Sequence, residues 1–240
     1  MLTRENIRSG LIRDMIRRAD PTMRLLSDEE LRASIASVIT PDLAGHDVWL
    51  FGYGSLIWNP AFHFVKRRLG TVHGYHRRFC LWTHLGRGTP DFPGLVLGLE
   101  RGGSCRGVAF RVAAEAVPDE LEIVWRREMV SGAYRPTWVT VRTPVGPLRA
   151  VTFVINRGHE RYAGLLPEDQ VADVIATASG QLGRCADYLI NTVAHLEELG
   201  IHDRALARLR DRVAEGRAEG PVREGRAVPI TPPPPAREAP

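Results

Sequence analysis

The chain has little lysine and little cysteine, which excludes several classes of site. Lys66 is the single lysine in 240 residues. It does not lie in the Gly-Lys-Ser/Thr sequence of a P-loop, and the near absence of lysine argues against Schiff-base chemistry with pyridoxal phosphate. The three cysteines, Cys80, Cys105 and Cys185, are far apart and form no Cys-x-x-Cys pair. The sequence therefore predicts neither a zinc site nor a disulfide framework.

Long apolar runs and clustered charge are also absent from the sequence. No run reaches the length of a membrane span, and the first residues lack the apolar segment of a signal peptide. Unpaired cysteines are typical of a reducing compartment, so we expect a soluble cytoplasmic protein with no membrane partner. The net charge is +4, from 32 basic and 28 acidic residues, but the arginines are scattered and form no basic stripe. We therefore expect no nucleic-acid partner.

Two helices are expected before the main domain, and a low-complexity tail after it. Apolar residues recur at helical spacing over residues 4–19, and Ser27 with Glu30 forms a capping-box pattern before a second helix. The tail is rich in Gly, Pro, Arg, Glu and Ala, so it cannot bury enough apolar surface to fold. The expected segments are an N-terminal helical extension (1–42), a main domain (43–213) and a disordered Pro-rich tail (214–240).

Apolar runs punctuated by glycine and proline predict several strands in the main domain. The expected strands cover residues 48–51, 72–83, 95–99, 107–112, 138–142 and 150–155. The expected helices cover residues 118–130, 167–179, 181–199 and 203–213. Closely spaced strands combined with helices predict an α+β fold, in which helices pack around a small barrel or a strongly curved sheet.

The most informative stretch is Trp-Leu-Phe-Gly-Tyr-Gly-Ser-Leu-Ile-Trp, residues 49–58. A buried strand meets Gly52 and Gly54, where the backbone can turn and leave its N–H groups bare for a ligand carboxylate or carbonyl. Two glycines alone would indicate only a strand-end turn, but the large apolar neighbours favour a rigid binding loop. A dinucleotide fingerprint is excluded because Ile57 occupies its third glycine position. Ser55 lacks the surroundings of an esterase nucleophile, so we interpret it as a hydrogen-bonding residue.

Glu128 differs from the other acids of the expected helix 118–130. The apolar face that it shares consists of Leu121, Val124 and Trp125. A carboxylate that points toward a core loses hydration, which raises its pKa and suits it to proton transfer near neutral pH. An equally good interpretation is a structural acid paired with an arginine, such as Arg111 or Arg142.

Two further features have open interpretations. Residues 87–94, Arg-Gly-Thr-Pro-Asp-Phe-Pro-Gly, could close over a site or only connect two strands. Tyr162 could place its phenol in a site or could simply pack. These features and the motifs above occur in an order that is found in a known family. The matching pieces are Phe-Gly-Tyr-Gly-Ser-Leu-Ile-Trp-Asn-Pro (51–60), Gly-Tyr-His-Arg-Arg-Phe-Cys (74–80), Arg-Gly-Thr-Pro…Pro-Gly-Leu-Val-Leu (87–97), Arg-Arg-Glu-Met (126–129) and Tyr162.

On these motifs, which span roughly residues 47–200, the chain resembles the ChaC-type γ-glutamylcyclotransferases. The resemblance implies a compact cyclotransferase fold and cleavage of glutathione, a small-molecule substrate, to 5-oxoproline and cysteinylglycine without a metal or cofactor. It implies that Glu128 is the catalytic acid/base. The implied substrate-binding residues are Tyr53, Gly54, Ser55, Leu56, Arg87, Tyr134 and Tyr162.

Several questions stay open at the level of sequence. In some members of this family a second acid upstream assists, and Asp119 and Glu120 are both candidates here. The protein could instead be a cyclotransferase for another γ-glutamyl amine or amino acid, or a non-catalytic γ-glutamyl-binding protein. The sequence does not predict an oligomeric state.

Overall fold

The computed structural model describes residues 2–218, which form an α+β fold around a closed barrel. The barrel strands are β1 (Val48–Gly52), β2 (Lys66–Thr83), β3 (Gly94–Val112), β4 (Tyr134–Thr143) and β5 (Gly146–Ile155). The helices are α1 (Arg4–Arg8), α2 (Leu11–Ala19), α3 (Asp28–Val38), α4 (Val117–Glu128), α5 (Glu168–Thr177), α6 (Cys185–Glu198) and α7 (Arg204–Ala218). Two 3-10 turns, η1 (Pro41–Leu43) and η2 (Ala114–Ala116), and a small hairpin, β6 (Ser179–Gly180) and β7 (Gly183–Arg184), complete the fold. The predicted fold class is confirmed.

The barrel follows the strand order β1-β3-β2-β4-β5 and closes because β5 also contacts β1 and β3. The neighbouring pairs in this order are antiparallel, whereas the contacts of β5 with β1 and β3 are parallel. One parallel contact pairs Leu50 with Val151, and the other pairs Leu99 with Val154. Closure brings the end of β1 and the start of β4 to one side of the barrel, where the candidate site lies.

The predicted strands 95–99 and 107–112 are one continuous strand, β3, which pairs with β2 along its whole length. The predicted gap between these two strands, which contains Gly102 and Gly103, was wrong. Both glycines adopt left-handed backbone conformations, with φ of 103° and 69°. Opposite them Gly74 has a φ of 84°, and the pairing register shifts beside it. Glycine permits these conformations without steric cost, so the ribbon bends and continues as a bulge.

The N-terminal extension contains more helices than the sequence predicted. The single helix expected over residues 4–19 is divided into α1 and α2, because Gly10 between them has a left-handed φ of 79°. The helix after it begins as predicted. The Ser27 hydroxyl accepts from the Glu30 amide at 3.1 Å, and the Glu30 carboxylate accepts from the Ser27 amide at 2.7 Å.

The C-terminal helices also differ from their predicted bounds. The helix expected over residues 181–199 begins only at Cys185, because the preceding residues form the β6–β7 hairpin. The last helix, α7, continues to Ala218, beyond the predicted start of the tail at residue 214. The rest of the predicted disordered tail, residues 219–240, lies outside the described residues.

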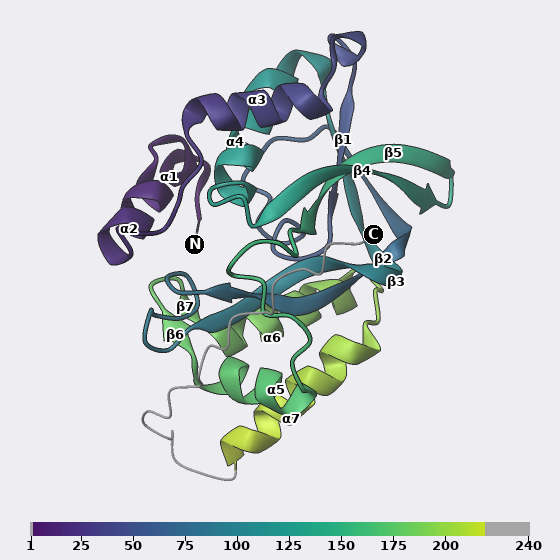
Figure 1. Ribbon diagram of the computed structural model, residues 1–240. Helices are drawn as coiled ribbons and strands as arrows, with labels where there is room; N and C mark the ends of the chain where they lie inside the picture. The colour runs from purple at the N-terminus through teal and green to yellow at the C-terminus, as the bar shows by residue number, and fades with distance from the viewer. Residues whose placement is uncertain (1, 219–240) are drawn as a thin grey trace, which may run out of the picture.

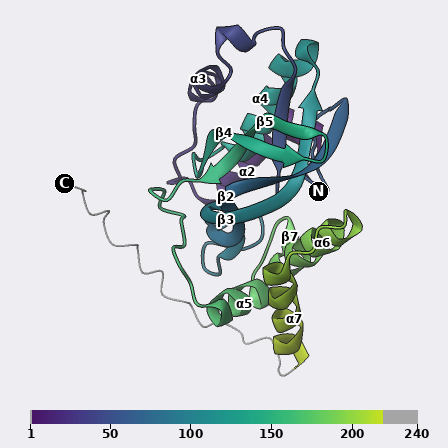
Figure 2. The ribbon, with the colours of Figure 1, turned by 90° about the vertical axis from the view of Figure 1, so that its right-hand side faces the viewer.

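The helices form two groups on opposite sides of the β2–β3 ribbon. In Figure 1, α1 to α4 lie with the upper part of the barrel, and α5 to α7 lie beneath the ribbon. Figure 2 shows the same separation from the side. One apolar cluster joins β2 and β3 to α5–α7, and a second joins β1 and β5 to α4, where Trp125 packs against Phe153. Within residues 2–218, no helix combines the length and the apolar character needed to cross a membrane.

Candidate active site

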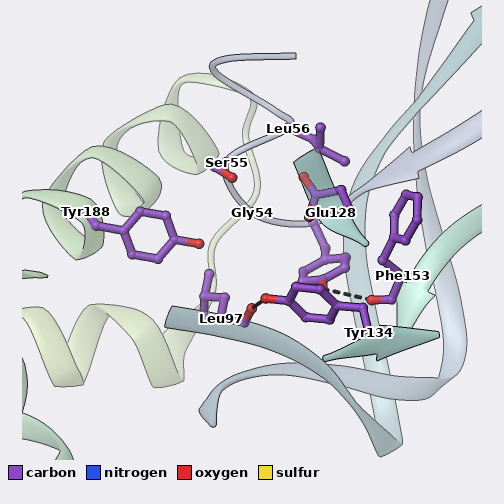
Figure 3. Close-up of a pocket in the computed structure, with 9 residues that line it drawn as sticks. Gly54, Ser55, Leu56, Leu97, Glu128, Tyr134, Phe153 and Tyr188 are labelled. Carbon is purple, nitrogen blue, oxygen red and sulfur yellow. Dashed lines mark hydrogen bonds between the residues drawn. The ribbon is translucent and has the colours of Figure 1, made fainter. Parts of the chain in front are cut away.

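A recess opens where the two helical groups approach each other across the barrel. It encloses about 310 Å³, counting the part that is open to solvent. Its lining comes from the loop after β1, from the ends of β3, β4 and β5, and from one helix of each group (Figure 3). The lining residues are Tyr53, Gly54, Ser55, Leu56, Leu97, Glu128, Tyr134, Phe153 and Tyr188.

The loop after β1 reaches the recess because glycine permits close packing there. The chain bends at Tyr53 and Gly54 and turns over residues 55–58, as expected, although neither Gly52 nor Gly54 has a left-handed φ. A Cβ at Gly52 would lie 3.1 Å from Leu56 Cβ, and a Cβ at Gly54 would lie 3.3 Å from the Tyr188 hydroxyl. Glycine therefore allows the loop to fold on itself and allows α6 to approach it.

The loop has backbone donors without an acceptor among the described residues. Ile57 and Asn59 donate their amides to carbonyls of this loop. Among residues 2–218, no acceptor receives the amide N–H groups of Gly54, Ser55 and Leu56. Successive free N–H groups form a site for an anion or a polarised carbonyl oxygen.

Glu128 occupies the last turn of α4 and points into the recess. Leu121, Val124 and Trp125, which share its helix face, are fully buried, as the periodicity predicted. The Glu128 side chain retains 15% exposure. Burial raises its pKa above the ordinary value, and the adjacent Arg127 cation opposes that rise. The net effect is a carboxyl that holds its proton more tightly than an exposed glutamate.

The arginine that pairs with Glu128 was not predicted. Arg127 Nε lies 3.0 Å from Glu128 Oε1. Of the two arginines proposed from the sequence, Arg111 pairs instead with Asp47 at 3.2 Å, and Arg142 lies exposed on β4. Glu128 is therefore ion-paired and also lines the recess, and its catalytic role stays a prediction.

Arg127 also fixes the loop. Its Nη2 donates to Ser55 Oγ at 2.7 Å, and its Nη1 donates to the carbonyls of Asn59 and Pro60. Ser55 is therefore a hydrogen-bonding residue, as expected. One buried guanidinium holds the carboxyl and the glycine loop in a fixed relation.

Three phenols surround the remaining space. Tyr53 Oη donates to the carbonyl of Phe153 at 2.8 Å, and Tyr134 Oη donates to the carbonyl of Leu97 at 2.7 Å. Tyr188 approaches from α6, and its hydroxyl points toward the loop that carries Gly54 (Figure 3). Burial raises the pKa of all three phenols, so each stays protonated at neutral pH. A phenol whose proton is held by a carbonyl still offers its oxygen lone pairs to a donor.

Arg87 and Tyr162, also predicted to bind substrate, are not among the lining residues. The Arg87 guanidinium lies over the Tyr188 ring, 5.8 Å from its centroid, and its Nη1 donates to the Arg184 carbonyl. Tyr162 Oη donates to the carboxylate of Glu100 at 2.7 Å. Arg87 therefore lies one ring away from the recess, whereas Tyr162 belongs to an ion-paired cluster around Glu100. A substrate contact of Tyr162 stays a prediction.

The two candidate second acids lie at the other end of α4. Glu120 is buried against Arg4, which donates to it, and it accepts the His63 amide at 2.9 Å. Asp119 is exposed and lies 3.9 Å from Arg8. Neither lines the recess. Arg4 and Arg8 belong to the N-terminal extension, so these two ion pairs connect it to the main domain.

Three lining residues were missed by the sequence reasoning. Leu97 stands in one of the family motifs, but the sequence predicts it only as a strand residue. Phe153 and Tyr188 carry no local signal, because one lies in an apolar strand and the other in an amphipathic helix. Only the packing of β5 and α6 against the loop brings them to the recess.

Comparisons with known proteins agree with this geometry. A family model described as ChaC-like protein matches residues 48–216. The chain is 39% identical over 206 residues to the glutathione-specific gamma-glutamylcyclotransferase of Escherichia coli (strain K12), which covers 84% of this chain and 89% of that protein. It is 35% identical over 173 residues to the human glutathione-specific gamma-glutamylcyclotransferase 1, covering 69% and 78%. A crystal structure of a glutathione-specific gamma-glutamyl cyclotransferase from yeast shares the fold, with a TM-score of 0.66 at 22% identity, covering 70% of this chain and 96% of that one.

Proposed function

The chain belongs to the ChaC-like family, and we propose that it cleaves reduced glutathione to 5-oxoproline and cysteinylglycine. The observation that carries this proposal is the arrangement of the recess. A desolvated carboxyl, Glu128, faces a loop with free amides at Gly54, Ser55 and Leu56. These are the groups that intramolecular amide cleavage requires, namely a proton carrier and fixed donors for an oxyanion.

The first step is proton removal from the substrate's α-ammonium group. An ammonium has no lone pair with which to attack, so the Glu128 carboxylate takes one proton from it. The rise in pKa caused by burial makes this carboxylate a stronger base than an exposed glutamate. The phenol oxygens of Tyr53 and Tyr134 can accept hydrogen bonds from the remaining N–H groups of the substrate, because each phenol already donates its own proton to a backbone carbonyl.

Attack then closes a five-membered lactam. The amine nitrogen forms a bond to the γ-carbonyl carbon of the same glutamyl group, and the C=O electron pair moves onto oxygen. Because nucleophile and electrophile belong to one molecule, folding the glutamyl chain correctly supplies most of the entropic advantage. The free amides of Gly54 and Ser55 are placed to donate to the oxyanion.

Collapse of this intermediate releases the dipeptide. The C–N bond to cysteine breaks as Glu128 returns its proton to the departing nitrogen. The ring nitrogen then loses its second proton to the regenerated Glu128 carboxylate, which passes it to the departing amine, so that the lactam keeps one N–H. Atoms balance without water, since glutathione is divided between 5-oxoproline and cysteinylglycine. No side-chain nucleophile is needed, in keeping with the interpretation of Ser55 as an acceptor for Arg127.

Arg87 is the group that we assign to the leaving dipeptide. Glutathione ends in a glycyl carboxylate, which needs a cation outside the γ-glutamyl recess. Arg87 stacks over the outer side of Tyr188, and no carboxylate among the described residues lies within 4.0 Å of it. This unpaired cation favours glutathione over a γ-glutamyl amine, which has no second carboxylate.

A reducing compartment suits both the substrate and the chain. Cys80, Cys105 and Cys185 are free and buried. We therefore propose a cytoplasmic enzyme whose partner is the small-molecule substrate, with no role in binding nucleic acid or membranes.

The proposal is tested by incubating the purified protein with reduced glutathione and following both products by mass spectrometry, with Glu128→Gln alongside. Wild type should form 5-oxoproline and cysteinylglycine in equal amounts. The variant should fold, because glutamine is of similar size and can still accept from Arg127, but its turnover should fall by at least the 10²–10⁴-fold typical of a lost acid/base. Wild-type turnover by Glu128→Gln would refute the mechanism. Absence of product from folded wild type, combined with turnover of γ-glutamyl amines, would favour the alternative substrate class.

A further inference from the structure

A buried arginine, Arg77 on β2, lies directly behind the glycine loop. Its side chain is 2% exposed. Its Nη1 donates to the carbonyl of Tyr53 at 2.7 Å, and its Nη2 donates to the carbonyl of Arg106. A cation is costly to bury unless it is paired and hydrogen-bonded, and Arg77 meets this condition through contacts that include the backbone of the glycine loop.

The contact with Tyr53 determines where the next amide points. The peptide bond is planar and trans, so the C=O of Tyr53 and the N–H of Gly54 point in opposite directions. Arg77, which holds that carbonyl, is not among the residues that line the recess. Tyr53 is held at a second point, because its phenol donates to the Phe153 carbonyl at 2.8 Å. The Gly54 N–H is therefore directed away from Arg77, and both Tyr53 and Gly54 line the recess.

The guanidinium is itself fixed from the far side by Asp203. Asp203 Oδ2 lies 3.0 Å from Arg77 Nε, in an ion pair whose angle does not make it a hydrogen bond. The other oxygen, Oδ1, accepts the amides of Ala205 and Leu206 at the first turn of α7. Asp203 therefore cannot turn away without uncapping α7.

We propose that Arg77, anchored by Asp203, is a positioning residue that aims and polarises the Gly54 N–H as an oxyanion donor. The inference rests on the cyclotransferase function proposed above. A hydrogen bond from a cation to the Tyr53 carbonyl withdraws electron density from the peptide, which makes the N–H at its other end a stronger donor. Such a donor acts on charge that develops in the transition state, so Arg77 raises kcat and leaves substrate binding nearly unchanged.

The test compares Arg77→Met, alone and combined with Asp203→Asn, with wild type on reduced glutathione. The double variant removes both charges of the pair, so no uncompensated charge is left buried, and asparagine can still cap α7. Arg77→Lys is the conservative variant. The matched control is Arg13→Met, because Arg13 likewise pairs with an aspartate, Asp28, and donates to a backbone carbonyl, but lies in the N-terminal extension.

We expect kcat of the double variant to fall about 10- to 10²-fold, less than the loss of a whole oxyanion donor, which costs 10²–10³-fold. KM should stay within about twofold and the pH profile should keep its shape, because Glu128 is untouched. Arg77→Lys should recover part of kcat, since it keeps the cation. Arg13→Met should lower the melting temperature and leave kcat per folded enzyme at the wild-type value.

Each contrary result has a distinct meaning. Unchanged kcat in the folded double variant would overturn the role of Arg77 while leaving the proposed function intact. A parallel change in KM and kcat would also overturn it, because that pattern indicates a distorted recess. If wild type itself releases no 5-oxoproline from glutathione, the proposed function fails, and the inference fails with it.

Discussion

Arg127 Nε lies 3.0 Å from Glu128 Oε1, although the two residues are consecutive on α4. Consecutive helix residues ordinarily point to different sides. Here Glu128 is in the last helical turn, and the Arg127 side chain, which also contacts Ser55 and Asn59, lies alongside it. The acid therefore experiences two opposing influences, since burial raises its pKa and the Arg127 cation lowers it.

Replacing Arg127 with methionine should move the acidic limb of the kcat/KM profile to higher pH. Without the cation, the carboxylate of Glu128 is less favoured, so its pKa rises further and the base becomes active only at higher pH. The substitution also removes the hydrogen bonds from Arg127 to the glycine loop. We expect this to lower kcat by about 10-fold or more, because small displacements of catalytic groups have costs of this size. The measurement is kcat/KM on glutathione from about pH 5 to about pH 9, a range that lies above the ordinary pKa of a glutamate carboxyl.

Arg126→Met is the matched control for this experiment. Arg126 precedes Arg127 on the same helix but points outward to Glu122 and Asp28. Its loss should leave the pH profile unchanged. If the two variants give the same profile, or if the limb of Arg127→Met moves to lower pH, Arg127 does not oppose the rise in the pKa of Glu128.

Arg87→Gln should raise KM for glutathione about 10-fold and leave kcat near the wild-type value, because it removes a contact made equally in ground and transition states. A glutathione analogue whose glycyl carboxylate is amidated should bind wild type and variant equally well. Equal loss of affinity for both compounds would show that Arg87 does not contact this carboxylate and acts only through packing on Tyr188.

Gly54→Ala should impair turnover through crowding. A Cβ at this position would lie 3.3 Å from the Tyr188 hydroxyl, so α6 or the loop must shift by a few tenths of an ångström. We expect kcat/KM to fall about 10-fold. In a Tyr188→Phe background the same substitution should cost less, because the clashing oxygen is gone. Identical costs in both backgrounds, measured as a double-mutant cycle, would exclude this clash as the cause.

Arg4→Met should destabilise the fold without changing kcat per folded molecule. The side chain of Glu120 is 4% exposed, and Arg4 is its charged partner, so the substitution should cost about 1–3 kcal/mol in the free energy of unfolding. Arg8→Met is the control, since the Arg8–Asp119 pair is exposed and should contribute at most about 1 kcal/mol. Urea unfolding measures both. Equal effects of the two substitutions would contradict the structural role of Glu120.

The same pair has a pH dependence. Burial alone would raise the pKa of Glu120, but the hydrogen bonds from Arg4 and the His63 amide outweigh it, so the net pKa is below the ordinary 4.5. The stability that the Arg4–Glu120 pair contributes is therefore fully present above pH 4.5 and is lost as the pH falls through the lowered pKa of Glu120. Arg4→Met should flatten this acid-side loss. A variant with the same acid sensitivity as wild type would assign that sensitivity to other carboxylates.

Local patterns in the sequence determined the parts of this protein that depend on short-range geometry. The helical period placed Glu128 on the buried face with Leu121 and Val124, and a capping box placed the start of α3 at Ser27. The glycine loop could be recognised as a binding element because its residues are contiguous. These features depend on spacings within one or two helical turns or one strand, which the sequence records directly.

Tertiary structure decided everything that depends on which elements meet. Leu97, Phe153 and Tyr188 reach the recess from three elements that are distant in sequence, and no local pattern marks Phe153 or Tyr188. The break expected at Gly102 proved to be a bulge, because pairing with β2 continues across it. The role proposed for Arg77 depends on β2, which carries it, and on Asp203 at the start of α7, which pairs with it. Burial and charge pairing are properties of the packed molecule, so the pKa of Glu128 and the direction of the loop amides follow from the fold and not from the order of residues.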